Sequence, residues 1–288
     1  MSDSPPAVSI LLPVRNGAPF LHAALASLLA QTLPDFEVLV LDDGSSDGSP
    51  ALARSLADPR IRVIEDGRHM GLSARLNQGV QLARANLVAR MDADDICLPR
   101  RLELQQAFLT AHPGVDLVGC RAAVFRDGEI LGLLPYAADH EALVARPWHT
   151  IPLPHPTWMG RRDWFLRHPY RTPEVKRAED QELLVRASPT SRYACLPDVL
   201  LAYRLGAPDL RKTLVARRTQ WLAQFRLLAG RGDWRGAGLS CVYGALKVGR
   251  DLGAALARRS GYRVHEGAHE QLEPGTRQAL AQALGRGA

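Results

Sequence analysis

Short apolar runs alternate with segments of helical spacing through the first hundred residues. The apolar runs lie at residues 8–12, 36–41, 61–64 and 87–89, and the helical segments between them at 18–29, 47–57 and 71–85. Strands joined through helices pair in parallel, because each crossover returns the chain to the same end of the sheet. This order predicts an α/β fold with a mostly parallel central sheet flanked by helices.

The chain has 288 residues, of which 46% are hydrophobic and 23% charged, as in an ordinary globular protein with one large domain and an appendage. The first apolar run is broken by Pro13 and followed by Arg15, which predicts neither a signal peptide nor a membrane span. The cysteines are far apart and form no C-x-x-C pair, which indicates reduced thiols in a cytosolic protein: Cys97, Cys120, Cys195 and Cys241.

Polar residues follow three of the expected strands at the point where each strand ends. Ligands of open parallel sheets bind beyond the carboxyl ends of the strands. These residues therefore meet at one edge of the sheet, although neither a G-x-G-x-x-G pattern nor a phosphate loop of the G-K-S/T type is present. They are Arg15 and Asn16 after the first strand, Asp42 and Asp43 after the second, and Asp92, Asp94 and Asp95 after the fourth.

The stretch 89–101, A-R-M-D-A-D-D-I-C-L-P-R-R, places three carboxylates within four positions. Because side chains alternate along a strand end, Asp92 and Asp94 can point to the same side and share a hard divalent ion such as Mg²⁺ or Mn²⁺. The alternative is a solvated turn that caps a helix starting near Pro99.

Four motifs in the first hundred residues, taken together, resemble the family 2 glycosyltransferases. They read V-S-I-L-L-P-V-R-N-G, D-D-G-S-S-D-G-S, G-L-S-A-R-L-N-Q-G and M-D-A-D-D with P-R-R-L after it. The resemblance continues through H-P-T-W-M-G, A-E-D-Q-E-L-L-V-R and L-P-D-V-L-L-A-Y-R, so that it covers residues 7 to 204.

The resemblance implies a GT-A fold and transfer of a sugar from a nucleoside-diphosphate donor with inversion, the base being uracil or thymine. It also implies a role for each residue of the nucleotide site. Asp43 accepts a hydrogen bond from the base and Asp42 supports its loop, Pro13, Arg15 and Asn16 line base and ribose, and Asp92 lies near ribose and metal, with Asp94 as the principal metal ligand. Relatives often have tyrosine where Arg15 stands and asparagine where His69 stands, and we assign His69 no role.

The departing diphosphate needs its charge neutralised, which a divalent ion on Asp94 does as a Lewis acid. The acceptor hydroxyl needs a general base on the opposite face of the sugar. By the family pattern Asp180 is that base, and Glu179 orients the acceptor or the loop. The alternative for this pair is capping and favourable dipole charge in the first turn of a helix.

Three further residues have two readings each. His155 is a site residue or a turn residue between two prolines, and Trp158 stacks on a sugar or lies in the core. Relatives often have a histidine two residues beyond the arginine of the Y-R pair, but here Gly206 stands there. Two alternatives follow. Either Arg204 binds the diphosphate, or the metal site is completed by Asp94, phosphate oxygens and water.

The boundaries we expect are a GT-A catalytic domain at 1–206, with a nucleotide-binding half at 7–100 and an acceptor half at 101–206, then a helical extension at 207–262 and a polar, frayed tail at 263–288. From Arg204 to Arg263 there are 13 Lys and Arg but three Asp, a net charge of +10 in a chain of +6. The extension is basic and amphipathic, with one apolar stripe through Leu214, Arg218, Trp221, Phe225 and Leu228 and another through Leu239, Val242, Leu246, Gly249, Gly253 and Leu256.

These helices pack on the catalytic domain or on a second subunit of a homodimer, or their basic faces lie on an anionic membrane. We expect the enzyme at the cytoplasmic side, peripheral on the inner face of the membrane, where it transfers sugar to a glycan or lipid-linked acceptor in cell-surface polysaccharide synthesis, with no nucleic-acid partner. Two other readings stay open: a sugar nucleotidyltransferase, and a non-catalytic module that binds nucleotide sugars or anionic surfaces.

Overall fold

The computed structural model describes residues 4–175, 177–207, 209–259 and 274–285. The strands are β1 (Val8–Val14), β2 (Phe36–Asp42), β3 (Ile61–Ile64), β4 (Leu87–Arg90), β5 (Ile96–Cys97), β6 (Leu117–Arg126), β7 (Glu129–Leu133), β8 (Met159–Arg161) and β9 (Tyr193–Arg204). The helices are α1 (Ala18–Leu29), α2 (Ser49–Ser55), α3 (Leu72–Leu82), α4 (Arg101–Ala111), α5 (His140–Val144), α6 (Arg162–Arg167), α7 (Glu179–Ala187), α8 (Leu210–Gly230), α9 (Trp234–Arg259) and α10 (Pro274–Gly285), with 3-10 turns η1 (His155–Thr157) and η2 (Ser188–Thr190).

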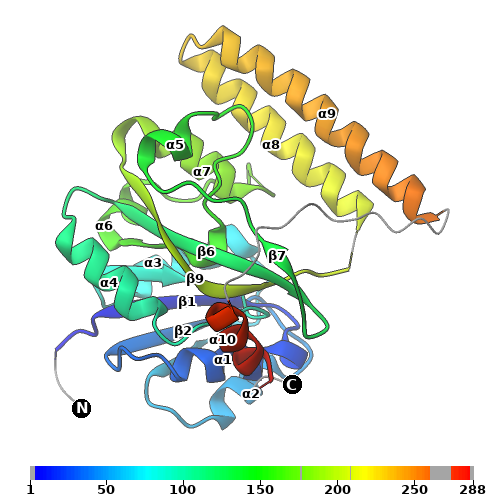
Figure 1. The fold of residues 1–288 in the computed structure, drawn as a ribbon. Helices are drawn as coiled ribbons and strands as arrows, with labels where there is room; N and C mark the ends of the chain where they lie inside the picture. Colours follow the sequence, from blue (N-terminus) through cyan, green and yellow to red (C-terminus); the bar gives the residue numbers. More distant parts are fainter. Residues whose placement is uncertain (1–3, 176, 208, 260–273, 286–288) are drawn as a thin grey trace.

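The described residues form one nine-stranded sheet in the order β3-β2-β1-β4-β8-β6-β9-β5, with β7 paired to β6 (Figure 1). The strands of the first hundred residues, β3, β2, β1 and β4, pair in parallel, as their alternation with helices predicts. β8 joins them antiparallel to β4, and β6 and β9 pair in parallel with each other. The structure thus confirms the α/β class with a mostly parallel sheet and C-terminal helices.

The central strand β1 explains the layering, because every one of its residues is buried. Its even-numbered residues, from Val8 to Val14, pack with α1, α2 and α4 on one face of the sheet. Leu11 points to the opposite face and packs with α3, α6 and α7. A strand covered on both faces has an almost continuous apolar sequence, which is the pattern of residues 8–12.

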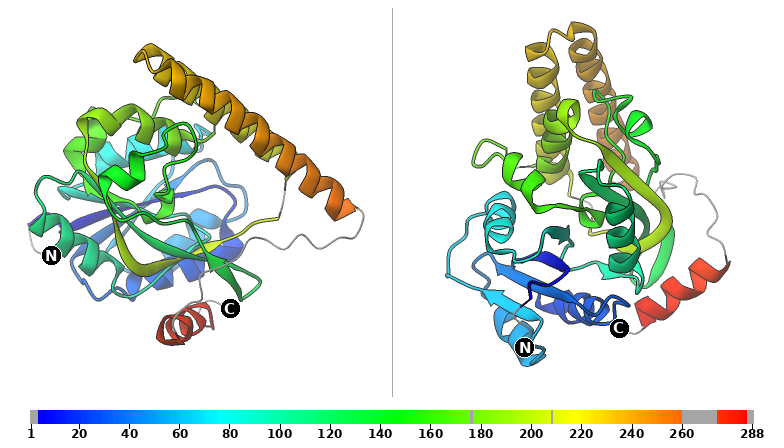
Figure 2. Two further views of the ribbon diagram at one scale, coloured as in Figure 1. Left: turned by 45° about the horizontal axis from the view of Figure 1, so that its top comes forward. Right: turned by 90° about the vertical axis from the view of Figure 1, so that its left-hand side faces the viewer.

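The two long helices α8 and α9 lie side by side as a hairpin that extends beyond the sheet (Figures 1 and 2). Leu228 of the first expected stripe is buried, whereas Trp221 and Phe225 are 37% and 36% exposed. On α9 the expected stripe faces solvent, since Val242 is 55% exposed and Leu246 63%. In this chain the α9 stripe therefore does not pack on the catalytic domain. None of the helices in the described ranges is both long enough and apolar enough to cross a bilayer.

The end of the chain differs from the expected polar tail. Pro274–Gly285 forms α10, which lies next to α1 in Figure 1, and its Leu280 is fully buried. Leu280 packs in a small cluster with Ala23 of α1 and Phe125 of β6. An apolar position every three to four residues is enough to bury one face of a helix, although the segment is polar on average. The other parts of that tail, 263–273 and 286–288, lie outside the described residues.

All four cysteines lie in the described part of the chain and none forms a disulfide. Cys97, Cys120 and Cys195 are buried in the sheet, and burial raises the pKa of each of these thiols. Cys241, on α9, is partly exposed. These are the unpaired thiols that the spacing of the cysteines indicates.

Gly79 lets α3 approach the sheet closely. A Cβ atom there would lie 2.7 Å from Leu41 Cδ1 and 2.8 Å from Leu11 Cδ2, whereas at Gly238 of α9 it would meet nothing within 4 Å. We expect Gly79→Ala to lower the free energy of unfolding by about 1–2 kcal/mol, because overpacking outweighs the helix preference of alanine. Gly238→Ala should raise it by about 0.5–1 kcal/mol, measured by urea denaturation. Equal stabilisation by both would show that α3 is not pressed against the sheet.

Candidate active site

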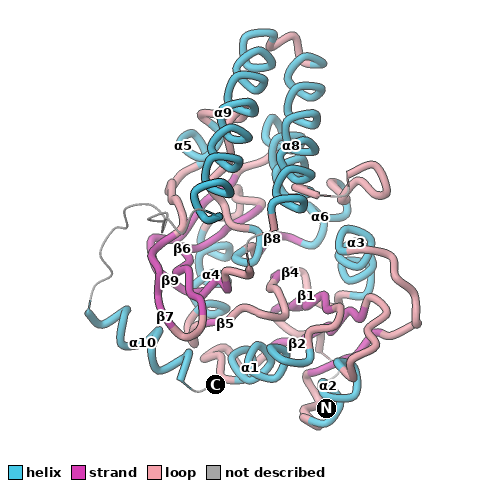
Figure 3. Tube along the Cα trace, turned by 90° about the vertical axis from the view of Figure 1, so that its right-hand side faces the viewer, coloured by secondary structure: helices cyan, strands magenta, loops and turns pink. Residues whose placement is uncertain are grey.

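Three strand ends lie together at the carboxyl edge of the sheet, since β1 is paired with β2 on one side and β4 on the other. The backbone joins them further: Asp43 N donates to Val14 O at 2.8 Å, and Met91 N donates to Leu11 O at 3.1 Å. The loops that leave these three strands carry the polar residues that the sequence analysis singled out. The structure thus brings Arg15 and Asn16, Asp42 and Asp43, and the acidic loop after β4 to one edge (Figure 3).

The Asp43 carboxylate accepts hydrogen bonds from the loop that precedes α3. Its Oδ1 accepts hydrogen bonds from Met70 N at 2.7 Å and from Arg75 Nε at 3.1 Å, and both oxygens accept from Gly71 N at 3.1 Å. Burial acts to raise the pKa of Asp43, but these hydrogen bonds, with that from His69, hold the pKa below its usual value. Asp43 therefore fixes residues 69–71, a role that the resemblance did not imply.

Asp42 and Asn16 shape the neighbouring turn. Asp42 Oδ2 accepts from Gly44 N and Ser45 N at 3.1 Å each, as expected of a loop-supporting residue, while its Oδ1 is buried with no partner among the described residues. Asn16, at a φ of 52°, accepts from Ser46 N at 2.8 Å through Oδ1 and donates its own N–H to Ser45 Oγ at 2.9 Å. Asn16 thus links the loop after β1 to the loop after β2, next to the buried Pro13.

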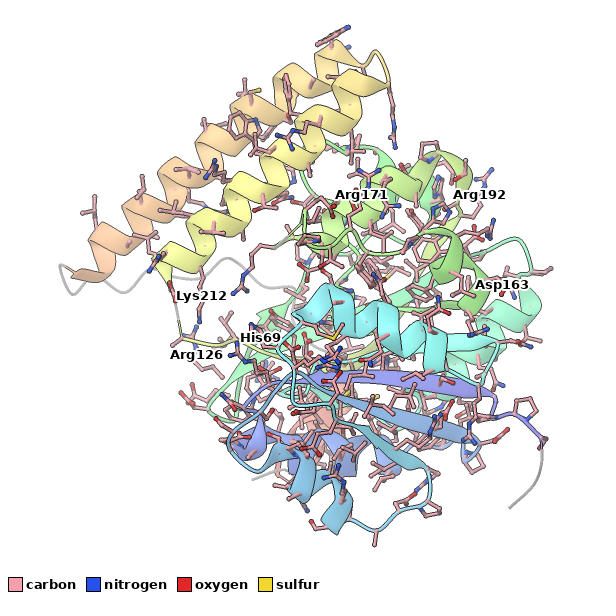
Figure 4. The ribbon with its side chains drawn as sticks, turned by 180° about the vertical axis from the view of Figure 1, so that it is seen from behind. His69, Arg126, Asp163, Arg171, Arg192 and Lys212 are labelled. Carbon is pink, nitrogen blue, oxygen red and sulfur yellow. The ribbon has the colours of Figure 1, made fainter. Side chains whose placement is uncertain are left out.

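Arg15, His69 and Asp43 form a continuous chain of contacts. His69 Nδ1 lies 2.7 Å from Asp43 Oδ2, and His69 Nε2 lies 3.0 Å from Arg15 Nη1. A guanidinium only donates hydrogen bonds, so Nε2 must accept and Nδ1 must carry the proton that goes to Asp43. His69, labelled in Figure 4, comes from the loop between β3 and α3 and is half exposed. The only indication of this link in the sequence is that both Arg15 and His69 depart from the family pattern.

The acidic loop after β4 holds three carboxylates in different surroundings. Burial and the charge of Asp92 raise the pKa of Asp94, which is partly exposed. Asp95 is fully buried, and burial and the charge of Asp92 raise its pKa well above the usual value. Asp95 Oδ1 accepts from Arg204 N at 2.8 Å, whereas its Oδ2 has no partner in the described part of the chain. The loop therefore carries more negative charge than its hydrogen bonds compensate.

Arg90, the last residue of β4, is the buried cation beneath this loop. Its Nη2 pairs with Asp92 Oδ1, while Nε and Nη1 find no hydrogen-bond acceptor within the described ranges. Burial acts to lower the pKa of Arg90, but Asp92, Tyr170, Asp95 and Glu179 raise it above its ordinary value. Sequence reasoning missed this residue, although an arginine at the end of an apolar strand, directly before three acids, is a readable signal.

Glu179 and Asp180 open α7 and interact electrostatically with the same guanidinium. Burial, followed by the charge of Asp180, raises the pKa of Glu179 to about 7, and Arg90 opposes this increase. Burial also raises the pKa of Asp180, against hydrogen bonds from Gln181 and the charge of Arg90. A raised carboxyl pKa near neutrality is typical of a general base in a desolvated site.

The structure bears on the two readings that the sequence leaves open for Trp158 and for His155. Trp158 is fully buried and donates from Nε1 to Leu153 O at 3.0 Å, so it is a core residue that cannot stack on a sugar. His155 lies in η1, is 7% exposed, and its Nε2 is 2.7 Å from the Tyr170 hydroxyl. Burial and the charge of Arg90 lower the pKa of His155 well below the usual value, so the ring is neutral. His155 thus positions Tyr170 from behind the site.

Arg204, at the end of β9, holds the acidic loop by its backbone and its side chain. Its Nε donates to Asp94 O at 2.8 Å, and its guanidinium lies over the rings of Phe20 at 4.4 Å and Phe125 at 4.5 Å. Two aromatic faces and a carbonyl fix this side chain in place. Arg204 is therefore close to the expected diphosphate position, with part of its hydrogen-bonding capacity used by the protein.

Protein ligands alone do not complete a metal site in this part of the fold. Among the described residues no group of three or more His, Cys, Asp or Glu is arranged to hold a metal ion. The residues still fit a divalent cation, because Asp94 is desolvated beside Asp92 and the buried Asp95 Oδ2 is unpaired. Oxygen ligands of this kind suit Mg²⁺ or Mn²⁺, with diphosphate oxygens and water as further ligands.

Comparison with known proteins identifies the class of enzyme. The model of the family described as "Glycosyl transferase family 2" matches residues 9–168, more than half of the chain. The chain belongs to this family, and it is a glycosyltransferase of an inverting family related to bacterial enzymes of polysaccharide biosynthesis.

One curated relative is the amylovoran biosynthesis glycosyltransferase AmsE of Erwinia amylovora, which is 32% identical over 204 residues, 67% of this chain and 73% of the relative. Other relatives are matched over very different shares of their own length, 36% in one case and 84% in another. The activity of a whole relative is therefore carried over only as a proposal.

Two solved structures share the fold. Staphylococcus aureus TarS 1-349, in complex with UDP-GlcNAc, has a TM-score of 0.67 and 17% identity, and the match covers 97% of this chain and 80% of that one. The mannosyltransferase PcManGT from Pyrobaculum calidifontis, in complex with GDP-Man and Mn²⁺, has a TM-score of 0.59 and 20% identity, with coverage of 99% and 87%. At such identities these neighbours support the GT-A-like fold and nothing finer.

The Glu179–Asp180 pair predicts a specific pH dependence. A base works deprotonated, so we expect kcat/KM for transfer to rise with pH through about 7, the raised pKa of Glu179. Glu179→Gln removes the carboxyl that titrates near 7, so the acid limb should move to lower pH, because Asp180, whose charge raises the pKa of Glu179, ionises first. The exposed Glu174→Gln serves as the control and should leave the limb in place. A limb that stays at the same pH in Glu179→Gln would exclude Glu179 as the group that sets it.

Proposed function

We propose that this protein transfers a sugar, with inversion, from UDP-sugar or dTDP-sugar to a hydroxyl of a glycan or lipid-linked acceptor in cell-surface polysaccharide synthesis. The observation that carries the proposal is the meeting of two acidic groups around Arg90. Asp92 pairs with the guanidinium from the loop after β4, and Asp95 of the same loop and Glu179 and Asp180 at the start of α7 interact with it electrostatically. One group serves the departing diphosphate and the other serves the attacking hydroxyl.

In the proposed reaction Asp180 takes the proton of the acceptor hydroxyl as the hydroxyl oxygen forms its bond to the anomeric carbon. The bond from that carbon to the donor diphosphate breaks on the opposite side, and the diphosphate leaves with the electron pair. Glu179 orients the acceptor beside Asp180. Hydrogen bonds from Gln181 and the positive charge of Arg90 oppose the increase in the pKa of Asp180 that burial causes, and so favour the ionised form that a base requires.

The nucleotide is proposed to bind at the loops after β1 and β2. Pro13, Arg15 and Asn16 would line base and ribose, and Asp43 would act by holding residues 69–71 in position. Asp42 would support the turn. The UDP-GlcNAc complex of TarS favours UDP as the first nucleotide to test.

A divalent ion, Mn²⁺ or Mg²⁺, would be held by Asp94 with Asp92 nearby and would supply Lewis-acid neutralisation of the diphosphate charge. The Mn²⁺ in the PcManGT complex supports this part of the proposal. Arg204, fixed by Asp94 O and two aromatic rings, would add a second positive charge near the same diphosphate. The protein thus faces the leaving group with residues from β4, β9 and the loop between β4 and β5.

Variants of the two aspartates should separate binding from chemistry. We expect Asp180→Asn to reduce kcat by at least about 100-fold while UDP and Mn²⁺ still raise the melting temperature as in the wild type. Asp94→Asn should remove the Mn²⁺-dependent part of the UDP shift. The measurement is a thermal-shift panel of UDP, dTDP, GDP, CMP and ADP, with and without Mn²⁺, together with UDP release from UDP-sugars. Absence of any nucleotide shift in the wild type would contradict the proposed donor site.

The hairpin is proposed to rest on the anionic cytoplasmic face of the membrane, next to the acceptor. Its support is the exposed apolar row of α9, which includes Val242 and Leu246, in a segment with a large excess of basic residues. Four unpaired cysteines fit a reducing compartment. A homodimer through the same row is the competing arrangement.

We expect Val242→Ser with Leu246→Ser to lower sedimentation with phosphatidylglycerol vesicles by about tenfold, since each substitution removes about 1.5 kcal/mol of apolar burial or less. Val215→Ser, an exposed apolar position on α8 that is 46% exposed, is the matched control. Analytical ultracentrifugation of the same proteins reports the dimer. Unchanged vesicle binding with loss of a dimer would assign the row to a subunit interface instead.

A further inference from the structure

A cavity of about 770 Å³ lies between the hairpin and the catalytic domain, and it does not belong to the nucleotide site. Its walls come from residues 134–154, from the first turn of α7 and from α8 and α9. Asp180 lines this cavity, together with Gln181. The proposed base is therefore open to a space that the donor loops after β1, β2 and β4 do not line.

Three cationic side chains of the hairpin line the same cavity: Arg217, Lys247 and Arg250. The carboxylate of Asp251 offsets part of their charge, at 2.8 Å from Arg217 Nε and 3.5 Å from Arg250 Nη2. Arg146, from the facing loop, adds a fourth positive charge to the lining. Even with Asp180 counted as ionised, the charged lining therefore has a positive excess.

Lys247 forms no ion pair with an acid among the described residues. Its Nζ donates to His149 O at 2.6 Å and to Thr150 Oγ1 at 2.8 Å, both neutral groups. Burial, with the charges of Arg217 and Arg250, lowers the pKa of Lys247 to about 8. Burial, and then the charges of Lys247 and the neighbouring arginines, lower the pKa of His149. An anion in the cavity would relieve this repulsion.

The remaining walls are mostly apolar, and include Leu134, Tyr136, Ile151 and Leu153. An apolar wall with a few convergent charged groups is typical of a ligand site rather than of a gap between packed elements. The cavity joins an anion-binding side on α8 and α9 to a general base on α7.

We infer that this cavity is the acceptor site, and that Arg217, Lys247 and Arg250 bind a phosphate or diphosphate group attached to the acceptor. The inference rests on the proposed function, which it deepens by naming the acceptor class. Phosphate esters match a cluster of arginine and lysine because each oxygen accepts charge-assisted hydrogen bonds. An acceptor anchored there would extend a hydroxyl past Asp180 toward the donor, so that the hydroxyl can contact both the base and the anomeric carbon.

The anion can come from two sources, a lipid-linked diphosphate or a soluble phosphorylated glycan, and the probes separate them. We would titrate the full chain with farnesyl diphosphate, with inorganic pyrophosphate, and with phosphatidylcholine vesicles with and without phosphatidylglycerol. EDTA and excess UDP are present throughout. EDTA removes the metal ion on which the proposed donor site depends. Excess UDP fills the donor site if nucleotide still binds there without the metal, so that the probes cannot bind in it.

The variant is Lys247→Gln with Arg250→Gln, and the matched control is Arg235→Gln, an exposed arginine of α9 that does not line the cavity. Arg217 is kept because it pairs with Asp251 across the hairpin. We expect the double variant to weaken farnesyl diphosphate binding by about 100-fold, about tenfold for each lost charge-assisted bond. The control should bind as the wild type does, and melting temperatures report the fold of all three proteins.

If the double variant loses affinity for pyrophosphate as much as for farnesyl diphosphate, the result supports an anion site that takes a soluble phosphorylated acceptor. If the wild type clearly prefers farnesyl diphosphate to pyrophosphate, the result supports a lipid-linked acceptor. Equal diphosphate affinity in wild type and double variant would overturn the inference. So would equal loss in Arg235→Gln, or an effect confined to anionic vesicles. Intact UDP-Mn²⁺ binding alongside any of these results leaves the proposed function standing, whereas a wild type that binds no nucleotide refutes the function itself.

Discussion

A single buried guanidinium carries the positive charge that balances two acidic segments of the candidate site. Arg90 interacts with acids from the loop after β4 and from the start of α7, two segments almost ninety residues apart in the chain. Two hydrogen bonds hold the backbone of Arg90 in place: Arg101 Nη2 donates to Arg90 O at 2.7 Å, and Arg90 N donates to Trp158 O at 2.9 Å. A buried cation with unused donors is costly unless acids surround it. The site therefore depends on the cation and the acids together.

The fold was largely predictable from the sequence, because period and turn residues are local properties. The run Val8–Val14 and the helix Ala18–Leu29 lie where the pattern places them. The roles of Trp158 and His69 were not predictable, since burial against Leu153 and contact with Asp43 are long-range facts that no local pattern encodes. The helix α10 was missed for a related reason, because its stability comes from packing against α1 and β6.

The hairpin lies beyond residue 168, where the family match ends, and yet it is joined directly to the acidic loop of the candidate site. β9 ends at Arg204, which is hydrogen-bonded to this loop, and α8 starts six residues later. The same helices then line the cavity that contains Asp180. Under the proposed function, the part of the chain that matches the family would bind the donor, and the basic extension would bind the acceptor.

The distribution of thiols has a practical consequence. Three cysteines are sealed in the sheet with raised pKa values, and thiolate is the reactive form, so these side chains resist alkylation in the folded state. Cys241 is the one cysteine with solvent access, and it lies on α9, less than two helical turns from Leu246 and Lys247. A maleimide dye would therefore mark the hairpin alone, and its emission would follow events on the acceptor side while the nucleotide side stays unlabelled.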